Sequence, residues 1–246
     1  MTFSACPVHI ARQLIDSPAN LLLMHFSSEE YREIAPDLEC VSLPLGKMIH
    51  YANEPIEYIY FPDRAMISLI ATMENGATTE ISLVGKEGMV GLPALLGGNS
   101  ITYDAIVQVM GTAMRIKSSI LKEKFDRFVN LRQVLLLYTQ VRLSYISQLA
   151  ACNRQHKIEN RLARWLLLVQ DCIVSNHLPL TQEFIANMLG TNRAGVTLAA
   201  RKLQDMGVIS YSRGQITVLN RQKLETVSCE CYRVMSQETS RLFGNS

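Results

Sequence analysis

The sequence has no run of eighteen consecutive apolar residues, although 48% of its 246 residues are hydrophobic. A helix that crosses a bilayer needs about 20 such residues, so we predict no membrane span and no membrane partner. The first ten residues also lack a basic stretch followed by an apolar one, which is the pattern of a secretory signal peptide. We therefore expect a cytoplasmic protein of one large or two ordinary domains.

Cysteine is sparse and scattered. The six cysteines, at positions 6, 40, 152, 172, 229 and 231, do not form the dense framework of a small secreted domain. Only Cys229 and Cys231 are close, as C-x-C, and no second pair faces them in the sequence. We predict scattered reduced thiols and no metal site.

Catalytic motifs are also missing. The sequence shows no Ser-His-Asp, phosphate-loop or dinucleotide-binding motif. A metal-dependent enzyme on a β-roll would need two closely spaced histidines and a carboxylate, whereas His50 stands alone among the expected strands. We predict that the protein is not an enzyme and carries no cofactor.

Charge is distributed unevenly along the chain. Residues 151–246 hold 12 Lys and Arg against 7 Asp and Glu, and residues 1–150 hold 12 against 15. The C-terminal part is therefore net basic, which favours a polyanionic partner for that part.

Between Val41 and about Lys117 the sequence predicts a series of short strands. Segments rich in β-branched and aromatic residues alternate with turn signals, and Asn75-Gly76 is typical of a hairpin because both residues tolerate positive φ. Even strand spacing indicates a barrel or a double-sheet roll. The segments are 56–61, 65–73, 78–84, 105–109 and 112–116.

A long helix is expected next, because Phe125 to Asn153 contains neither Pro nor Gly. One set of its residues repeats at spacings of four and three, which is the pattern of a coiled-coil seam. We interpret this seam as a homodimer interface, with a core helix inside one subunit as the alternative. Its residues are Val134, Tyr138, Val141, Tyr145, Gln148 and Cys152.

Residues 181–203 carry the pattern of a helix-turn-helix. Thr181 is the expected N-cap of the first helix, and Asn192 is placed to start the second. Gly190 lies where the chain must turn, at a position that favours a left-handed backbone. Ala186 allows the helices to approach closely, and Val196 fills the angle between them.

The outward face of the second helix predicts contacts to DNA. Arg193 and Thr197 suit base edges in the major groove, whereas Thr181, Gln182 and Lys202 suit phosphates. Residues 208–219 predict a hairpin wing with Arg213 at its tip. The complete set of expected DNA-binding residues is Thr181, Gln182, Thr191, Asn192, Arg193, Thr197, Arg201, Lys202 and Arg213.

In these features the sequence resembles the Crp/Fnr family of bacterial transcription regulators, from about Val41 to Leu219. The resemblance implies an α+β fold with a cyclic-nucleotide-binding-like β-roll over residues 1–127. It further implies a dimerisation helix over 128–153 and a C-terminal winged helix-turn-helix over 154–246. Such a protein regulates transcription as a homodimer on a palindromic site in double-stranded DNA, contacts RNA polymerase and responds to an effector at the roll.

The family's effector site corresponds to a glycine-bearing stretch of this chain, and the resemblance places Gly88, Gly91, Leu92, Pro93 and Tyr103 there. Cyclic-nucleotide binders of the family carry a Glu at the position of Leu92 and an Arg at the position of Tyr103 in our alignment. A cyclic phosphate needs a cationic cradle, so we do not expect cyclic AMP to bind. Two cysteines, Cys6 and Cys40, are also too few for the family's iron–sulfur cluster.

Two classes of function remain open from the sequence. The favoured one is the DNA-binding regulator. The alternative is a ligand-binding or scaffold β-roll protein whose helix-turn-helix is purely structural. The salt dependence of binding to duplex DNA discriminates between them, because neutralised phosphates release counterions.

Overall fold

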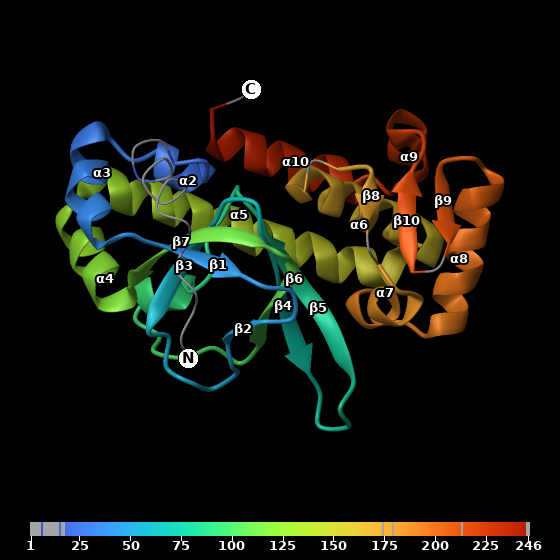
Figure 1. Cartoon of the computed structure of the whole chain (residues 1–246), viewed down its shortest axis with the longest axis horizontal. Helices are drawn as coiled ribbons and strands as arrows, with labels where there is room; N and C mark the ends of the chain where they lie inside the picture. Colours follow the sequence, from blue (N-terminus) through green and yellow to red (C-terminus); the bar gives the residue numbers. More distant parts are fainter. Residues whose placement is uncertain are drawn as a thin grey trace. The chain divides into compact units, whose positions relative to one another are not determined.

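The structure, a computed structural model, describes residues 6, 15, 18–173, 175–178, 180–212 and 214–244. The chain forms two compact units, which Figure 1 shows with their elements labelled. Unit 1 consists of Met1–Leu69, Leu83–Leu143 and Thr239–Ser246, and unit 2 of Ile70–Ser82 and Ser144–Glu238. Of the helices in the described part of the chain, none has the length and apolarity needed to cross a bilayer.

Unit 1 begins with short helices that follow their capping signals. Ser27 accepts a hydrogen bond from the backbone of Glu30, and the Glu30 carboxylate accepts one from the backbone of Ser27. This capping box starts α3, and Pro36 lies in the 3-10 turn that follows it, where the helix ends. The elements are α2 (Leu21–Met24), α3 (Ser28–Ile34) and η1 (Ala35–Asp37).

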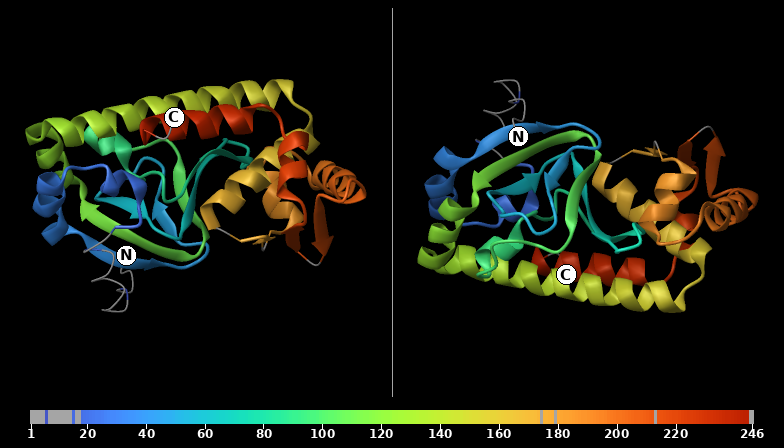
Figure 2. Two further views of the ribbon diagram at one scale, coloured as in Figure 1. Left: turned by 90° about the horizontal axis from the view of Figure 1, so that it is seen from above. Right: turned by 90° about the horizontal axis from the view of Figure 1, so that it is seen from below.

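The strands form the β-roll that the sequence predicts. They make a three-stranded sheet in the order β1-β7-β3 and a four-stranded sheet in the order β2-β6-β4-β5. Figure 2 shows β1 and β7 running side by side as an antiparallel pair. The strands are β1 (Glu39–Leu43), β2 (Met48–His50), β3 (Tyr58–Pro62), β4 (Met66–Thr72), β5 (Thr78–Val84), β6 (Asp104–Val109) and β7 (Gly111–Lys117), with a 3-10 turn, η2 (Leu92–Leu95), between β5 and β6.

The prediction of five strand segments is confirmed, and β1 and β2 are additions. The hairpin at the predicted turn closes with a hydrogen bond of 2.9 Å from the Met73 amide to the Ala77 carbonyl oxygen. Gly76 adopts φ +80° there, which accounts for glycine at this position.

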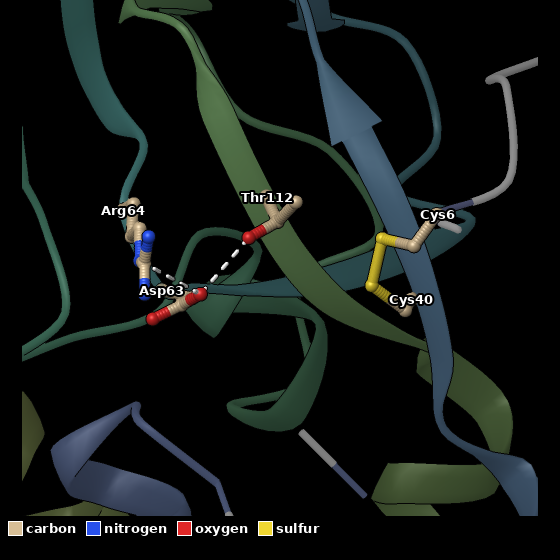
Figure 3. Close-up of a disulfide and its surroundings, with 5 residues drawn as sticks. All are labelled: Cys6, Cys40, Asp63, Arg64 and Thr112. Carbon is tan, nitrogen blue, oxygen red and sulfur yellow. Dashed lines mark hydrogen bonds and ion pairs between the residues drawn. A yellow bond between two sulfur atoms is a disulfide. The ribbon is translucent and has the colours of Figure 1, made fainter. Parts of the chain in front are cut away.

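The prediction that all six cysteines are reduced thiols is wrong for two of them. Figure 3 shows a disulfide between Cys6 and Cys40, which lies in β1. Both residues are buried in the core of unit 1. Their sequence separation of 34 hid the pairing, because only the folded strand brings them together.

The long helix is interrupted once. Helix α4 (Ser118–Arg127) ends at Phe128, whose extended backbone separates it from α5 (Val129–Gln155). Helix α5 runs to Gln155, two residues beyond Asn153, where we predicted the long helix to end, and His156 and Lys157 separate it from the next helix.

Two residues of the predicted seam on α5 lie in the core of the chain itself. Tyr138 and Cys152 are almost fully buried within the chain, so their assignment to a dimer interface is wrong. The other members (Val134, Val141, Tyr145 and Gln148) are half-buried. The exposed large apolar residues of α5 are instead Val129, Leu136, Leu137, Leu143 and Ile146. Three of them, Val129, Leu136 and Leu143, repeat at spacings of seven and lie on one face of the helix, and we call these three the α5 apolar stripe.

Unit 2 contains the helix-turn-helix and a small sheet of order β8-β10-β9. Trp165 of α6 is fully buried, and its indole donates to the Glu80 carboxylate at 2.9 Å. The remaining elements are α6 (Ile158–Ile173), β8 (His177–Leu178), α7 (Gln182–Met188), α8 (Arg193–Asp205), β9 (Ile209–Ser212), β10 (Gln215–Val218), α9 (Arg221–Val227) and α10 (Cys231–Leu242).

Candidate DNA-binding surface

The two helices of the helix-turn-helix start at the predicted caps. The Thr181 hydroxyl accepts from the Phe184 amide at 3.2 Å and starts α7. The Asn192 side chain accepts from the Gly195 amide at 2.8 Å and starts α8. Both contacts satisfy amides that would otherwise lack a partner at a helix N-terminus.

The turn between the helices has the expected geometry. Gly190 adopts φ +57°, and the Thr191 amide donates to the Ala186 carbonyl oxygen at 2.9 Å. Ala186 and Val196 are buried, which lets α7 and α8 pack closely. The Arg161 guanidinium of α6 donates to the Leu189 carbonyl oxygen at the end of α7. These contacts fix the orientation of α8, which carries the outward-facing side chains.

A groove of about 840 Å³ lies between α7, the outer face of α8 and the β9–β10 hairpin, elements that Figure 1 shows grouped together. It brings together five of the predicted DNA-binding residues with five that the sequence did not single out. The predicted residues are Thr181, Gln182, Arg193, Thr197 and Arg201, and the others are Glu183, Gln204, Tyr211, Ser212 and Gly214.

Gln182 connects the two helices across this groove. The Thr197 hydroxyl donates to Gln182 Oε1 at 2.9 Å, and Arg193 Nε lies 3.5 Å from the same oxygen. The side chains of Arg193 and Thr197 are both exposed. A major groove offers acceptors on guanine and a methyl group on thymine, which suit these two side chains.

Tyr211 of β9 is the most informative addition to the predicted set. Burial raises the pKa of its phenol, and a hydrogen bond with the Gln182 backbone opposes that shift. The phenol therefore stays neutral and can donate a hydrogen bond to a phosphate. The sequence predicts Tyr211 only as a residue of the hairpin. Its place in the groove follows from the packing of β9 beside α7, which the sequence does not show.

Three predicted DNA contacts have other roles in the structure. The Asn192 side chain acts as a helix cap, and Thr191 is half-buried near Gly195. Lys202 Nζ lies 2.9 Å from the Glu159 carboxylate, which lowers the pKa of that carboxyl group. This pair is solvent-accessible and thus weak, so Lys202 remains able to exchange Glu159 for a phosphate. Arg213 lies outside the described residues.

The predicted effector stretch packs tightly in unit 1. Gly91 adopts φ +104°, and a Cβ there would lie 3.2 Å from the Tyr58 carbonyl oxygen. A Cβ at Gly88 would overlap the Tyr138 hydroxyl, which accepts from the Met89 amide at 3.0 Å. Leu92 packs against the core. Both glycines are therefore required by close approach of side chain and backbone within the roll.

A cation near this stretch comes from α5 and was missed by the sequence reasoning. Arg142 Nη1 donates to the Leu83 carbonyl oxygen at 2.9 Å, and its guanidinium lies 6.0 Å from the centroid of the Tyr138 ring. Burial raises the pKa of Tyr103, and the positive charge of Arg142 opposes the shift. Helix α5 thus supplies a positive charge that residues 88–103 lack.

Comparison with known proteins covers both units. Residues 40–128 match the model of the cyclic nucleotide-binding domain, and residues 160–227 match that of the Crp-like helix-turn-helix domain. The chain is 23% identical to the Global nitrogen regulator of Synechococcus elongatus over 189 residues. The aligned region covers 71% of this chain and 83% of the relative. The regulator of the same name from Nostoc sp. is 23% identical over 186 residues, 70% of this chain and 82% of the relative.

Solved structures show the same fold. A transcriptional regulator of the Crp/Fnr family from Eubacterium rectale matches with a TM-score of 0.68 and 21% identity, over 84% of this chain and 96% of the other. FixK2 from Bradyrhizobium japonicum matches with a TM-score of 0.68 and 20% identity, over 78% of this chain and 98% of the other.

Proposed function

Since the chain belongs to the Crp/Fnr family of transcriptional regulators, we propose that it binds a palindromic operator as a homodimer and responds to a signal at the β-roll. The observation that carries this proposal is the groove beside α8. It combines the exposed start of a well-capped helix with a hairpin at its side, and its polar residues can contact both bases and phosphates.

The homodimer part of the proposal rests on the α5 apolar stripe. Its members Val129, Leu136 and Leu143 follow one another at spacings of seven, so they lie on the same face of the helix. Leu136 and Leu137 also line a surface groove of about 270 Å³. Exposed leucines on a long helix are costly in water, and a second copy of α5 would cover them by coiled-coil packing.

A two-fold symmetric dimer binds best to an operator with the same two-fold symmetry. The two α8 helices would enter successive major grooves about 34 Å apart, so the half-sites should be inverted and one helical turn apart. Such a regulator acts in the cytoplasm and recruits or hinders RNA polymerase at the promoter.

Cyclic AMP is not the signal that we propose. Leu92 and Tyr103 replace the acid and the arginine of cyclic-nucleotide binders, and the apolar Leu92 side chain packs against the core. Arg142 is the nearby cation, and its guanidinium already donates a hydrogen bond to the Leu83 carbonyl oxygen.

Selection of bound duplexes from a random library tests the proposal directly. The full-length protein should enrich an inverted repeat with half-sites about 10 base pairs apart, and sedimentation should give two chains per duplex. Enrichment of no sequence would support the alternative in which the helix-turn-helix is structural only.

A further inference from the structure

Four potential metal ligands meet in unit 2, away from the DNA-binding groove. Cys152 lies in the last turn of α5 and His156 directly follows that helix, while Cys231 is the first residue of α10 and Cys229 lies two residues before it. We call these four residues the thiol–imidazole cluster. The prediction that the thiols are scattered is therefore wrong for three of them, because the fold brings Cys152 and His156 to the C-x-C motif.

Two distances within the cluster equal the ligand spacing around a tetrahedral ion, and the others lie within about 1 Å of it or less. The three sulfur atoms and one imidazole nitrogen all lie within 4.8 Å of one another. Cys152 Sγ is 3.5 Å from Cys229 Sγ, and Cys231 Sγ is 3.5 Å from His156 Nδ1. With Zn–S of about 2.3 Å and Zn–N of about 2.0–2.1 Å, a tetrahedron has edges of about 3.5–3.8 Å.

The surroundings of the cluster orient its ligands. His156 Nδ1 faces the sulfur atoms, while its Nε2 lies 3.2 Å from the Glu230 carboxylate. A carboxylate on the second nitrogen fixes the ring and makes the first nitrogen a better ligand, as in many zinc sites. Gln148 Nε2 also donates to Cys231 Sγ at 3.1 Å, and this type of contact stabilises a thiolate.

Buried positive charge supports thiolates at this position. Arg164 is almost fully buried, and its positive charge interacts with both Cys152 and Cys229. Three thiolates bound to a divalent cation leave one net negative charge, which a neighbouring guanidinium offsets.

We propose that the thiol–imidazole cluster binds one zinc ion in tetrahedral geometry. Zinc is borderline soft and prefers four sulfur and nitrogen ligands, and a set of three thiolates and one imidazole fills every position. A closed set of four protein ligands is typical of a structural site rather than a catalytic one. The ion would join the end of α5 to the turn between α9 and α10, and binding would release the protons of the thiols.

Cobalt substitution in the full-length, fully reduced protein tests the proposal. We expect one Co²⁺ per chain, with thiolate-to-metal charge-transfer absorption and tetrahedral ligand-field bands, and we expect Zn²⁺ to displace it. Cys152→Ser and Cys229→Ser should lose these bands. Cys172→Ser is the matched control, since Cys172 lies outside the cluster, and it should retain them.

A variant at Glu230 keeps the test independent of folding. Glu230 is exposed, so Glu230→Gln should fold normally and weaken Zn²⁺ binding by about 10-fold or more through the orientation of His156. Circular dichroism of each metal-free variant checks the fold. If the reduced wild-type protein takes up no Co²⁺, or if Cys152→Ser and Cys229→Ser bind it as the wild type does, the proposal is overturned.

Discussion

The side-chain oxygen of Gln182 accepts a hydrogen bond from the Thr197 hydroxyl at 2.9 Å, which links the first residue of α7 to the exposed middle of α8. Arg193, one turn earlier on α8, approaches the same oxygen at 3.5 Å. Gln182 of α7 thus positions the two side chains of α8 that we propose to contact base edges.

Arg193→Ala should reduce affinity for the selected operator by about 1–3 kcal/mol and relax specificity at one base pair of each half-site. The physical reason is the loss of a bidentate donor from a base edge. Binding isotherms on the operator and on its single-base variants measure both effects. Arg233→Ala removes the same charge from an exposed position of α10 and should change affinity little. A uniform loss on all sequences would show that Arg193 contacts only phosphate.

Asn192→Ala should destabilise the protein by about 1 kcal/mol, because the Gly195 amide loses its cap. Asn192→Asp keeps the acceptor and should retain the stability. The same aspartate places a negative charge at the DNA-facing start of α8 and should weaken operator binding. Chemical denaturation and DNA titration of the two variants separate these effects. If Asn192→Ala were as stable as the wild type, the side chain of Asn192 would not stabilise α8 as a cap.

Leu143→Glu should convert the dimer into monomers and lower operator affinity, because a carboxylate in the α5 apolar stripe cannot be buried between two helices. Leu143 is 63% exposed in the single chain. Leu45→Glu is the control, since Leu45 is 62% exposed and lies outside α5. Light scattering after gel filtration gives the molar mass. A dimer that survives Leu143→Glu would place the interface elsewhere.

His50 should make stability depend on pH. Burial lowers its pKa from 6.5 to about 4, while a hydrogen bond with the Tyr58 backbone opposes the shift. Between these values the unfolded chain binds a proton that the folded chain does not. Its stabilising contribution is therefore complete above pH 6.5 and falls by about 1.4 kcal/mol per pH unit towards pH 4.

The measurement is the free energy of unfolding from pH 5 to 7 for wild type and His50→Gln, whose amide can still donate to a carbonyl. The difference between the two proteins should shrink as the pH falls. His177→Gln, at an exposed position, serves as the control and should follow the wild type. If the free energies of unfolding of His50→Gln and the wild type changed in parallel with pH, His50 would not be the source of the pH dependence.

Local signals explain what the sequence predicted correctly. A cap such as Thr181 and a turn glycine such as Gly190 act over a few residues, so the start of α7 and the turn before α8 could be located from the chain alone. The order of roll, long helix and helix-turn-helix followed in the same way from periodicity and turn residues.

Long-range pairing explains what the sequence reasoning missed. The repeat that contains Tyr138 and Cys152 is a real helical stripe, but periodicity does not say whether its partner is another subunit or the same chain. In the structure the Tyr138 hydroxyl accepts a hydrogen bond from the Met89 amide, and Cys152 contacts Cys229, 77 residues away. Contacts of this kind depend on the tertiary fold, as does the disulfide of Cys6 with Cys40.

The central claim is sequence-specific binding of duplex DNA through α8, and the most direct measurement is affinity for the selected inverted repeat and for a scrambled duplex across a salt series. A dimer that neutralises six or more phosphates should lose about 1,000-fold in affinity between about 50 and 200 mM salt on both duplexes. The inverted repeat should remain at least about 1,000-fold tighter than the scrambled duplex throughout. Equal affinity for the two duplexes, or affinity that does not change with salt, would contradict the account.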